Sequence, residues 1–192
     1  AKNLAEHGVF SRNVTAPFSP EQLRTPGYPL LLAFFYKLIP TVPFLAAVQN
    51  VFFLIGIILV YQIALLLGTR KGTALMAAGL LALEPTTVYW NNQLTTESFF
   101  AVFLLAAVFY FIAFFKHSPL RTLFYAGFFL GFSLLVRPVT QYLGVIFLIA
   151  LGVVGVRQRL AWKRLGLGAA LFLLGYGAIT APWMYRNAAL FG

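Results

Sequence analysis

The chain has 192 residues, of which 61% are hydrophobic and only 9% are charged. A soluble domain carries about 25% charged residues, and its core cannot bury this much apolar surface. The sequence therefore predicts a protein whose solvent is mostly the lipid bilayer. The formal net charge is +10, but the basic residues fall in short clusters between apolar runs. That arrangement is typical of membrane topology and argues against nucleic acid as a partner.

Cysteine and aspartate are both absent, which restricts the chemistry of the chain. Without cysteine there is neither a disulfide nor a thiolate metal site. The two histidines, His7 and His117, are expected on opposite sides of the membrane, so they cannot share a metal ion. The sequence thus predicts no metal site. Carboxylate chemistry within the chain depends on its four glutamates, which are Glu6, Glu21, Glu84 and Glu97.

The first stretch, residues 1–41, is expected to be a loop outside the membrane core. It contains the string Arg24-Thr25-Pro26-Gly27-Tyr28-Pro29, in which the prolines restrict φ and Gly27 permits a tight turn. The apolar segment 28–39 is too short to span a bilayer and is expected to form an interfacial helix. Arg24 stands before this helix. Its guanidinium either binds a phosphate through two parallel hydrogen bonds or reaches the lipid headgroups as an anchor.

Six later segments approach the roughly 20 apolar residues that a spanning helix needs. We expect them near residues 42–67, 72–90, 98–115, 122–136, 139–156 and 165–183. The fold class expected from the sequence is therefore all-α, a polytopic transmembrane helical bundle. Residues 1–41 would form its first outer loop, with short juxtamembrane helices, and residues 42–192 would form the transmembrane module.

The basic residues between the predicted spans fall mainly in alternate loops and so define one side of the membrane. These residues are Arg70, Lys71, Lys116, Arg121, Arg157, Arg159, Lys163 and Arg164. The opposite loops and end carry only Arg137 and Arg186. The positive-inside rule places the richer side in the cytoplasm, so residues 1–41 are expected to face outward.

Charged residues that are rare in apolar spans gather on the predicted outer side. Glu97 opens the third predicted span, Glu84 lies in the outer half of the second, and Arg137 stands at an outer span end. A charge at membrane depth costs about 2.5–3.5 kcal/mol, so such residues usually face a protein interior or a polar cavity. We therefore expect Arg24, Glu97 and Arg137 to line one outward-facing cavity that handles an anion.

Structural roles also fit the same residues. Glu97 in the first turn of a helix is favoured by the helix dipole. Glu84 precedes Pro85 and is expected to pair with Arg137, because a carboxylate within a span needs a partner. Arg137 and Arg186 also suit simple anchoring at the membrane interface.

Five motifs, spread along nearly the whole chain, resemble those of a known family. They are Ala5-Glu6-His7-Gly8-Val9-Phe10-Ser11, the Arg24 to Pro29 string, Leu94-Thr95-Thr96-Glu97, Val136-Arg137-Pro138 and Pro182-Trp183-Met184-Tyr185-Arg186-Asn187. In this order they resemble the sequence motifs of GT-C-type glycosyltransferases. The likeness is greatest to the branch that contains aminoarabinose transferase and the protein O-mannosyltransferases.

The resemblance implies an inverting membrane enzyme that moves a sugar from a polyprenyl-phosphate donor to a lipid, glycan or protein acceptor. The reaction would take place on the outer face of a bacterial plasma membrane. By resemblance, Arg24, Tyr28 and Arg137 would bind the donor phosphate, with Glu84 and Arg186 supporting them. Because phosphate leaves without protonation, the chemistry needs mainly a base and a cation. The resemblance requires no cofactor and leaves a divalent cation open.

The family's catalytic aspartate, in the first outer loop, would lie upstream of Ala1, as would the first span. C-terminal spans are likewise expected beyond the sequence, which would then be an inactive fragment of a longer enzyme. Within it, Glu97 is the candidate catalytic carboxylate. The alternative function is a transporter or flippase for a lipid-linked or anionic solute, which requires charges near the bilayer midplane. The cytoplasmic halves of the predicted spans are almost purely apolar, which favours a one-sided site.

The predicted topology can be tested by cysteine labelling in intact cells, because the chain contains no cysteine of its own. A cysteine introduced as Arg12→Cys should react with a membrane-impermeant maleimide added from outside. A cysteine introduced as Arg159→Cys should react only after the cells are permeabilised. Labelling of the first position solely from the cytoplasmic side would overturn the orientation.

Overall fold

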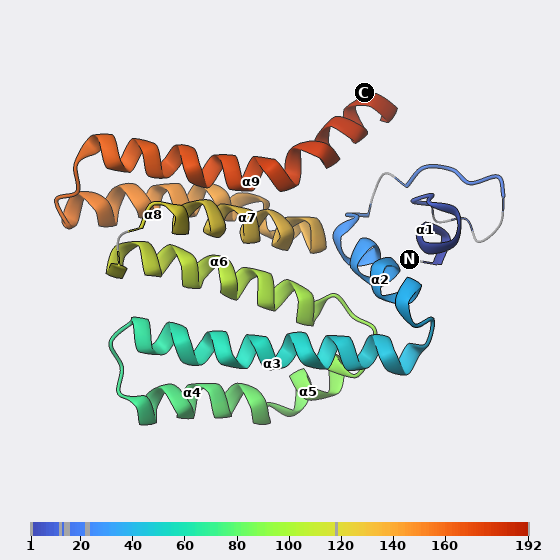
Figure 1. Cartoon of the computed structure of the whole chain (residues 1–192), viewed down its shortest axis with the longest axis horizontal. Helices are drawn as coiled ribbons and strands as arrows, with labels where there is room; N and C mark the ends of the chain where they lie inside the picture. Colours follow the sequence, from blue (N-terminus) through green and yellow to red (C-terminus); the bar gives the residue numbers. More distant parts are fainter. Residues whose placement is uncertain (1, 12, 14–15, 22–23, 118, 192) are drawn as a thin grey trace.

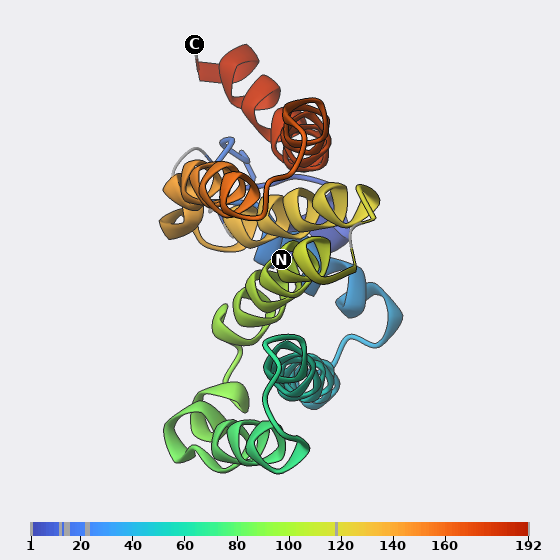
Figure 2. The same ribbon diagram turned by 90° about the vertical axis from the view of Figure 1, so that its left-hand side faces the viewer.

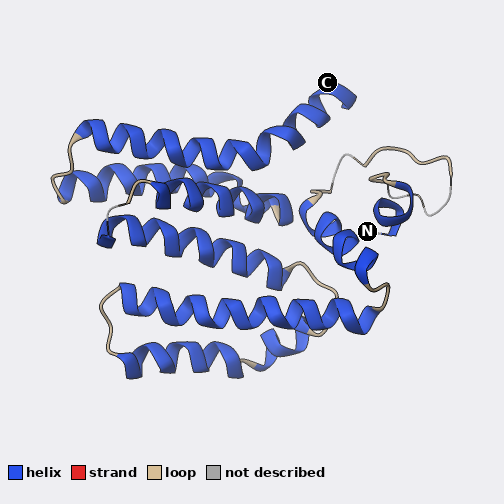
Figure 3. Cartoon of the chain, in the orientation of Figure 1, coloured by secondary structure: helices blue, strands red, loops and turns tan. Residues whose placement is uncertain are grey.

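The computed structural model describes residues 2–11, 13, 16–21, 24–117 and 119–191. In this part of the chain every regular element is a helix, apart from one isolated bridge between Ser11 and Pro20 (Figure 3). The all-α fold class predicted from the sequence is confirmed. In chain order the helices are α1 (Lys2–His7), α2 (Gly27–Leu38), α3 (Val42–Leu66), α4 (Lys71–Leu83), α5 (Pro85–Asn91), α6 (Glu97–His117), α7 (Arg121–Val136), η1 (Pro138–Tyr142), α8 (Leu143–Arg157) and α9 (Trp162–Phe191).

Among the described residues, four helical segments are long and apolar enough to cross a membrane. They are Val42–Leu66, Glu97–His117, Pro138–Arg157 and Trp162–Phe191. Two further predicted spans form shorter apolar helices, Lys71–Leu83 and Arg121–Val136. The protein is therefore an integral membrane protein. The short helix expected over residues 28–39 is present as α2.

Two predicted helix boundaries are wrong, and a proline is involved in each. The span expected over 72–90 is not continuous, because α4 ends at Leu83 and the chain is extended at Glu84 before Pro85 begins α5. The last span was expected to end near residue 183, but α9 continues to Phe191 with Pro182 inside it. Proline removes one helical hydrogen bond and bends a helix without necessarily ending it. The end of α9 accordingly turns away from the bundle (Figure 1).

The helices run back and forth, so alternate connections meet at the same end of the bundle (Figure 1). The α3–α4, α6–α7 and α8–α9 connections lie at the left-hand end, and α1 and α2 lie at the opposite end. Contacts link α4 to α3, α3 to α6, α6 to α7 and α7 to α9, so these helices form a row. Figure 2 shows this row in a second view. The basic clusters are therefore gathered at the end opposite α1 and α2.

Within the row α7 lies between α6 and α9, and its close contacts depend on glycine. Nine of its 16 residues are buried, compared with three of 25 in α3. A Cβ on Gly127 of α7 would overlap the Phe172 carbonyl of α9, and a Cβ on Gly175 of α9 would overlap the Phe124 carbonyl of α7. Small residues let helix backbones approach closely in membranes, where packing drives helix association. The glycines thus set the distance between α7 and α9.

A cluster of apolar side chains attaches α2 to the ends of the spanning helices. Its buried members are Leu32 of α2, Leu45 of α3, Phe99 and Phe103 of α6, and Val136 of α7. The rings of Phe52 and Phe99 lie 4.4 Å apart between their centroids, so α3 and α6 meet directly beneath α2. This packing fixes the position of α2, whose 12 residues are fewer than the roughly 20 of a spanning helix.

The close contact between α7 and α9 predicts the effect of alanine at two glycines. Gly127→Ala and Gly175→Ala should each reduce the free energy of unfolding by about 1–3 kcal/mol, the usual cost of overpacking. Thermal unfolding of the purified protein in detergent would measure this.

The matched control is Gly79→Ala in α4, where an added Cβ would meet no atom within 4 Å. It should be neutral or slightly stabilising, because glycine within a helix costs about 0.5–1 kcal/mol relative to alanine. Equal stability of the three variants would contradict the assigned packing.

Candidate functional site

The segment that carries Arg24 is packed on the C-terminal end of α7. A Cβ on Gly27 would lie 2.6 Å from the backbone carbonyl carbon and oxygen of Leu135, which leaves room only for glycine. The hydroxyl of Thr25 donates a hydrogen bond of 3.3 Å to the carbonyl of Val136. The turn before α2 is therefore held against the residues that directly precede Arg137.

Arg24 is exposed at the rim of a hollow of about 380 Å³, here called the Arg24 hollow. Its lining residues are Arg24, Thr25, Tyr28, Pro29, Thr96, Val136 and Pro138. Within the described part of the chain no ion pair or hydrogen bond engages the guanidinium of Arg24. Its five N–H donors are thus available to an anion.

Glu97 and Arg137 form an ion pair beside the Arg24 hollow. Arg137 Nη1 lies 3.1 Å from Glu97 Oε1, and the side chains are 42% and 50% exposed, respectively. The guanidinium of Arg137 also lies over the ring of Phe100, 5.6 Å from its centroid. Both charged residues line a second cavity of about 350 Å³, here called the Glu97 cavity, whose other walls are mostly apolar. The ion pair therefore holds Arg137 in a defined place while leaving it accessible.

The expected pair between Glu84 and Arg137 is wrong. The carboxylate of Glu84 instead caps α5, where it accepts hydrogen bonds from the backbone N–H groups of Thr86 and Thr87. A carboxylate satisfies the free N–H groups at a helix start and is favoured by the helix dipole. Arg137 takes Glu97 as its partner. The role of Glu84 in this structure is to begin α5 after the break.

Tyr28 connects α2 to a buried glutamine that the sequence interpretation missed. The hydroxyl of Tyr28 donates to Oε1 of Gln49 at 3.0 Å. Partial burial, and then the negative charge of Glu97, raise the pKa of Tyr28 above its ordinary value, so the phenol stays protonated. Gln49 Nε2 donates to the carbonyl of Gln93 at 2.8 Å and to that of Asn91 at 3.4 Å.

A second set of polar contacts continues from this glutamine to the start of α6. The side chain of Asn91 is buried and donates to Oδ1 of Asn50 at 2.7 Å. Its own Oδ1 accepts a hydrogen bond from the hydroxyl of Ser98, the residue after Glu97. Adjacent amides at Gln49 and Asn50 inside an apolar run were the signal that could have revealed this network, because an unpaired polar group is costly in lipid.

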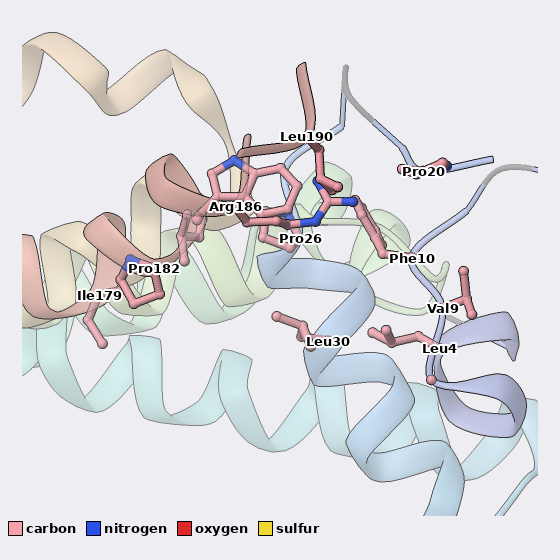
Figure 4. Close-up of a pocket in the computed structure, with 13 residues that line it drawn as sticks. Leu4, Val9, Phe10, Pro20, Pro26, Leu30, Ile179, Pro182, Arg186 and Leu190 are labelled. Atoms are coloured by element: carbon pink, nitrogen blue, oxygen red, sulfur yellow. The ribbon is translucent and has the colours of Figure 1, made fainter. Parts of the chain in front are cut away.

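Arg186 lies apart from the Glu97–Arg137 pair, on a larger cavity near the end of α9 (Figure 4). Its Nη1 donates to the carbonyl of Glu21 at 3.1 Å, and its guanidinium lies 4.7 Å from the ring centroid of Trp183. The cavity, here called the Arg186 cavity, has a volume of about 560 Å³. It is lined by Leu4, Gly8, Val9, Phe10, Pro20, Pro26, Leu30, Leu135, Ile179, Pro182, Trp183, Arg186 and Leu190.

The residues predicted from the sequence gather at one end of the bundle but do not share a single cavity. Arg24 and Tyr28 line one hollow, whereas Glu97 and Arg137 line its neighbour. The two are adjacent. Thr96 and Val136 line the Arg24 hollow, and the next residue after each, Glu97 and Arg137, lines the Glu97 cavity. Among the described residues no group of three potential metal-ligating side chains is close enough to hold an ion. Arg12, the proposed labelling position, lies outside the described residues.

A helical membrane bundle with cations and a carboxylate gathered at one end defines an integral membrane protein with a charged site at that end. Comparison with known families makes the class specific. The chain belongs to the family described as dolichyl-phosphate-mannose-protein mannosyltransferase, whose profile matches residues 23–185. It is thus a membrane glycosyltransferase of the GT-C type. No curated protein and no solved structure matches the chain.

The contact between Gly27 and α7 predicts that Gly27→Ala displaces the start of α2. Tryptic cleavage after Arg24 should become several-fold faster in the purified protein, because an undocked turn is open to protease. The control is Gly144→Ala, near the same end of the bundle, where an added Cβ would meet Tyr176 at an ordinary 3.9 Å. That variant should be cleaved at the rate of the unsubstituted protein. An unchanged rate for Gly27→Ala would show that the turn is not held by this contact.

Proposed function

We propose that the full-length protein transfers a sugar from a polyprenyl-phosphate donor to an acceptor at the end of the bundle that carries α2. We further propose that Arg24 binds the phosphate of the donor. The observation that carries this proposal is the placement of Arg24. Its guanidinium has no partner in the described chain, its turn is packed on α7, and the Glu97–Arg137 pair lies in the adjoining cavity. The basic loops at the opposite end favour an outward-facing site.

The reaction consists of one displacement at the anomeric carbon of the sugar. The acceptor oxygen forms a bond to this carbon from the face opposite the phosphate, while the bond from the carbon to the phosphate oxygen breaks, which inverts the centre. The acceptor proton passes to a general base, and polyprenyl phosphate leaves with the bonding electrons. Cations that stabilise the charge developing on the leaving phosphate lower the barrier. We assign the base to a carboxylate outside the present sequence, as the family resemblance implies.

The remaining site residues take roles that follow from their contacts. Arg137 is proposed to assist Arg24 at the phosphate, and Glu97 to hold Arg137 in place through their 3.1 Å contact. The hydroxyl proton of Tyr28 is directed to Gln49, so Tyr28, which the resemblance assigned to the phosphate, is proposed instead to form the wall of the hollow. Arg186 binds the carbonyl of Glu21 and is proposed to hold the outer loop against α9.

The Arg186 cavity supports a lipid-linked donor. A polyprenyl chain requires an apolar surface next to its phosphate, and this cavity is lined almost entirely by apolar side chains. It adjoins the Arg24 hollow through consecutive residues, because Pro26 and Leu135 border the former while Thr25 and Val136 border the latter. We propose that the isoprene units nearest the phosphate occupy this cavity.

The phosphate role of Arg24 predicts a specific order of activities in the full-length enzyme. Arg24→Ala should reduce sugar transfer at limiting donor at least ten-fold, since a charge-assisted hydrogen bond contributes about 1.5–3 kcal/mol and one decade corresponds to about 1.4 kcal/mol. Arg24→Lys should be intermediate, because lysine retains the charge but not the planar fork. Transfer from a purified donor in proteoliposomes would measure the series.

The matched control is Lys37→Ala, which removes an exposed cation that lies within α2 and does not line the Arg24 hollow. It should leave transfer unchanged. Full turnover by Arg24→Ala at limiting donor, with normal protein levels, would exclude the phosphate role and favour headgroup anchoring. Movement of intact lipid-linked sugar across the bilayer, without transfer, would instead favour the transporter alternative.

A further inference from the structure

Gln49 occupies an unusual position for an amide. It lies in α3, a helix that is apolar over almost its whole length, and its side chain is completely buried. In lipid, a polar side chain without partners costs several kcal/mol. Gln49 is nevertheless fully engaged, because its oxygen accepts from Tyr28 and its nitrogen donates to the carbonyls of Asn91 and Gln93. The three partners come from two segments that are not neighbours in sequence.

These contacts join the two halves of the candidate site. On one side is α2, which begins three residues after Arg24. On the other side is the α5–α6 connection, which ends at Glu97. Asn91 extends the link, because its side chain binds the hydroxyl of Ser98 in the first turn of α6. One buried side chain therefore stands between the turn that carries Arg24 and the helix start that carries the Glu97–Arg137 pair.

We propose that Gln49 is a positioning residue, which fixes the phosphate-binding turn of α2 relative to the Glu97–Arg137 pair. This inference rests on the proposed function for its catalytic meaning, but its structural part can be tested separately. A glutamine suits the position because one amide both accepts and donates hydrogen bonds. Glutamate accepts from Tyr28 but cannot donate to the two carbonyls. Methionine has a similar shape and makes none of the three bonds.

Gln49→Met is the variant that tests the inference in the full-length enzyme. If Gln49 sets the position of the phosphate-binding turn, the KM for the polyprenyl-phosphate donor should rise about ten-fold, while the KM for the acceptor stays constant. Gln49→Glu should raise the donor KM as well, because both carbonyl contacts are lost. A purely structural role would reduce the fraction of active enzyme, and would therefore lower kcat without changing either KM.

The control is Gln62→Met, which makes the same substitution in the same helix. Gln62 is exposed, and the described structure assigns its side chain no hydrogen bond. Both KM values and kcat should match those of the unsubstituted enzyme. A rise in donor KM for this control as large as that for Gln49→Met would overturn the inference, because the effect would then belong to α3 in general.

A distance measurement separates this inference from the proposed function. Spin labels at Leu38→Cys in α2 and Leu94→Cys in the α5–α6 connection report the relative position of the two segments, and both side chains are exposed. Pulsed electron paramagnetic resonance should give a narrow distribution of label-to-label distances in the doubly labelled protein that retains Gln49. The same labelled protein with Gln49→Met should give a broader or shifted distribution. An unchanged distribution would overturn the positioning role, whatever the activity. A changed distribution supports the positioning role, whatever the activity of Arg24→Ala. Full activity of Arg24→Ala would count against the proposed function and not against the positioning role.

Discussion

The site depends on the burial of α7 between two longer helices. Its contact with α9 is close enough that glycine is required at Gly127 and Gly175, and its other side packs on α6. Because interiors are close-packed, this arrangement leaves little freedom for the end of α7. The turn before α2 packs on the C-terminal end of α7, and Arg137 is the residue that directly follows α7. Apolar packing within the row of helices therefore fixes the position of charged groups at its edge.

The polar groups of the site are held by two different means. Arg137 and Glu97 restrain each other through charge in a half-exposed setting, where an ion pair alone contributes little to stability, about 0–1 kcal/mol. Gln49 and Asn91 are buried, and neutral amides make the links there without the cost of removing a charge from water. The two means suit their positions. The charged residues are exposed, where a substrate could reach them, and the neutral amides form rigid hydrogen bonds in the interior, where no substrate could.

The sequence predicted the helical membrane fold, the gathering of basic residues at one end and the short helix after Arg24, because apolar periodicity and charge clusters are local signals. It also predicted that Glu97 and Arg137 lie at the same end of the bundle. It paired Arg137 with Glu84, however, because a carboxylate before a proline was expected to lie within a span. The choice between Glu84 and Glu97 depends on where α4 ends: the chain is extended at Glu84 before Pro85, so the carboxylate caps α5 and does not lie within a span. The hydrogen bonds of Gln49 join segments more than 20 residues apart, and no local pattern predicts such contacts.

The bond from Arg186 to the carbonyl of Glu21 also sets an order of assembly. The two residues are 165 positions apart, and Arg186 lies after Pro182 in α9. A ribosome adds about 5–20 residues per second, so roughly 8–33 s pass between the synthesis of the first partner and that of the second. During that interval the segment before α2 has been synthesised, but Arg186, which donates to it, has not. This contact therefore forms only after the last helix of the row has been synthesised, and until then the segment before α2 lacks one of its partners.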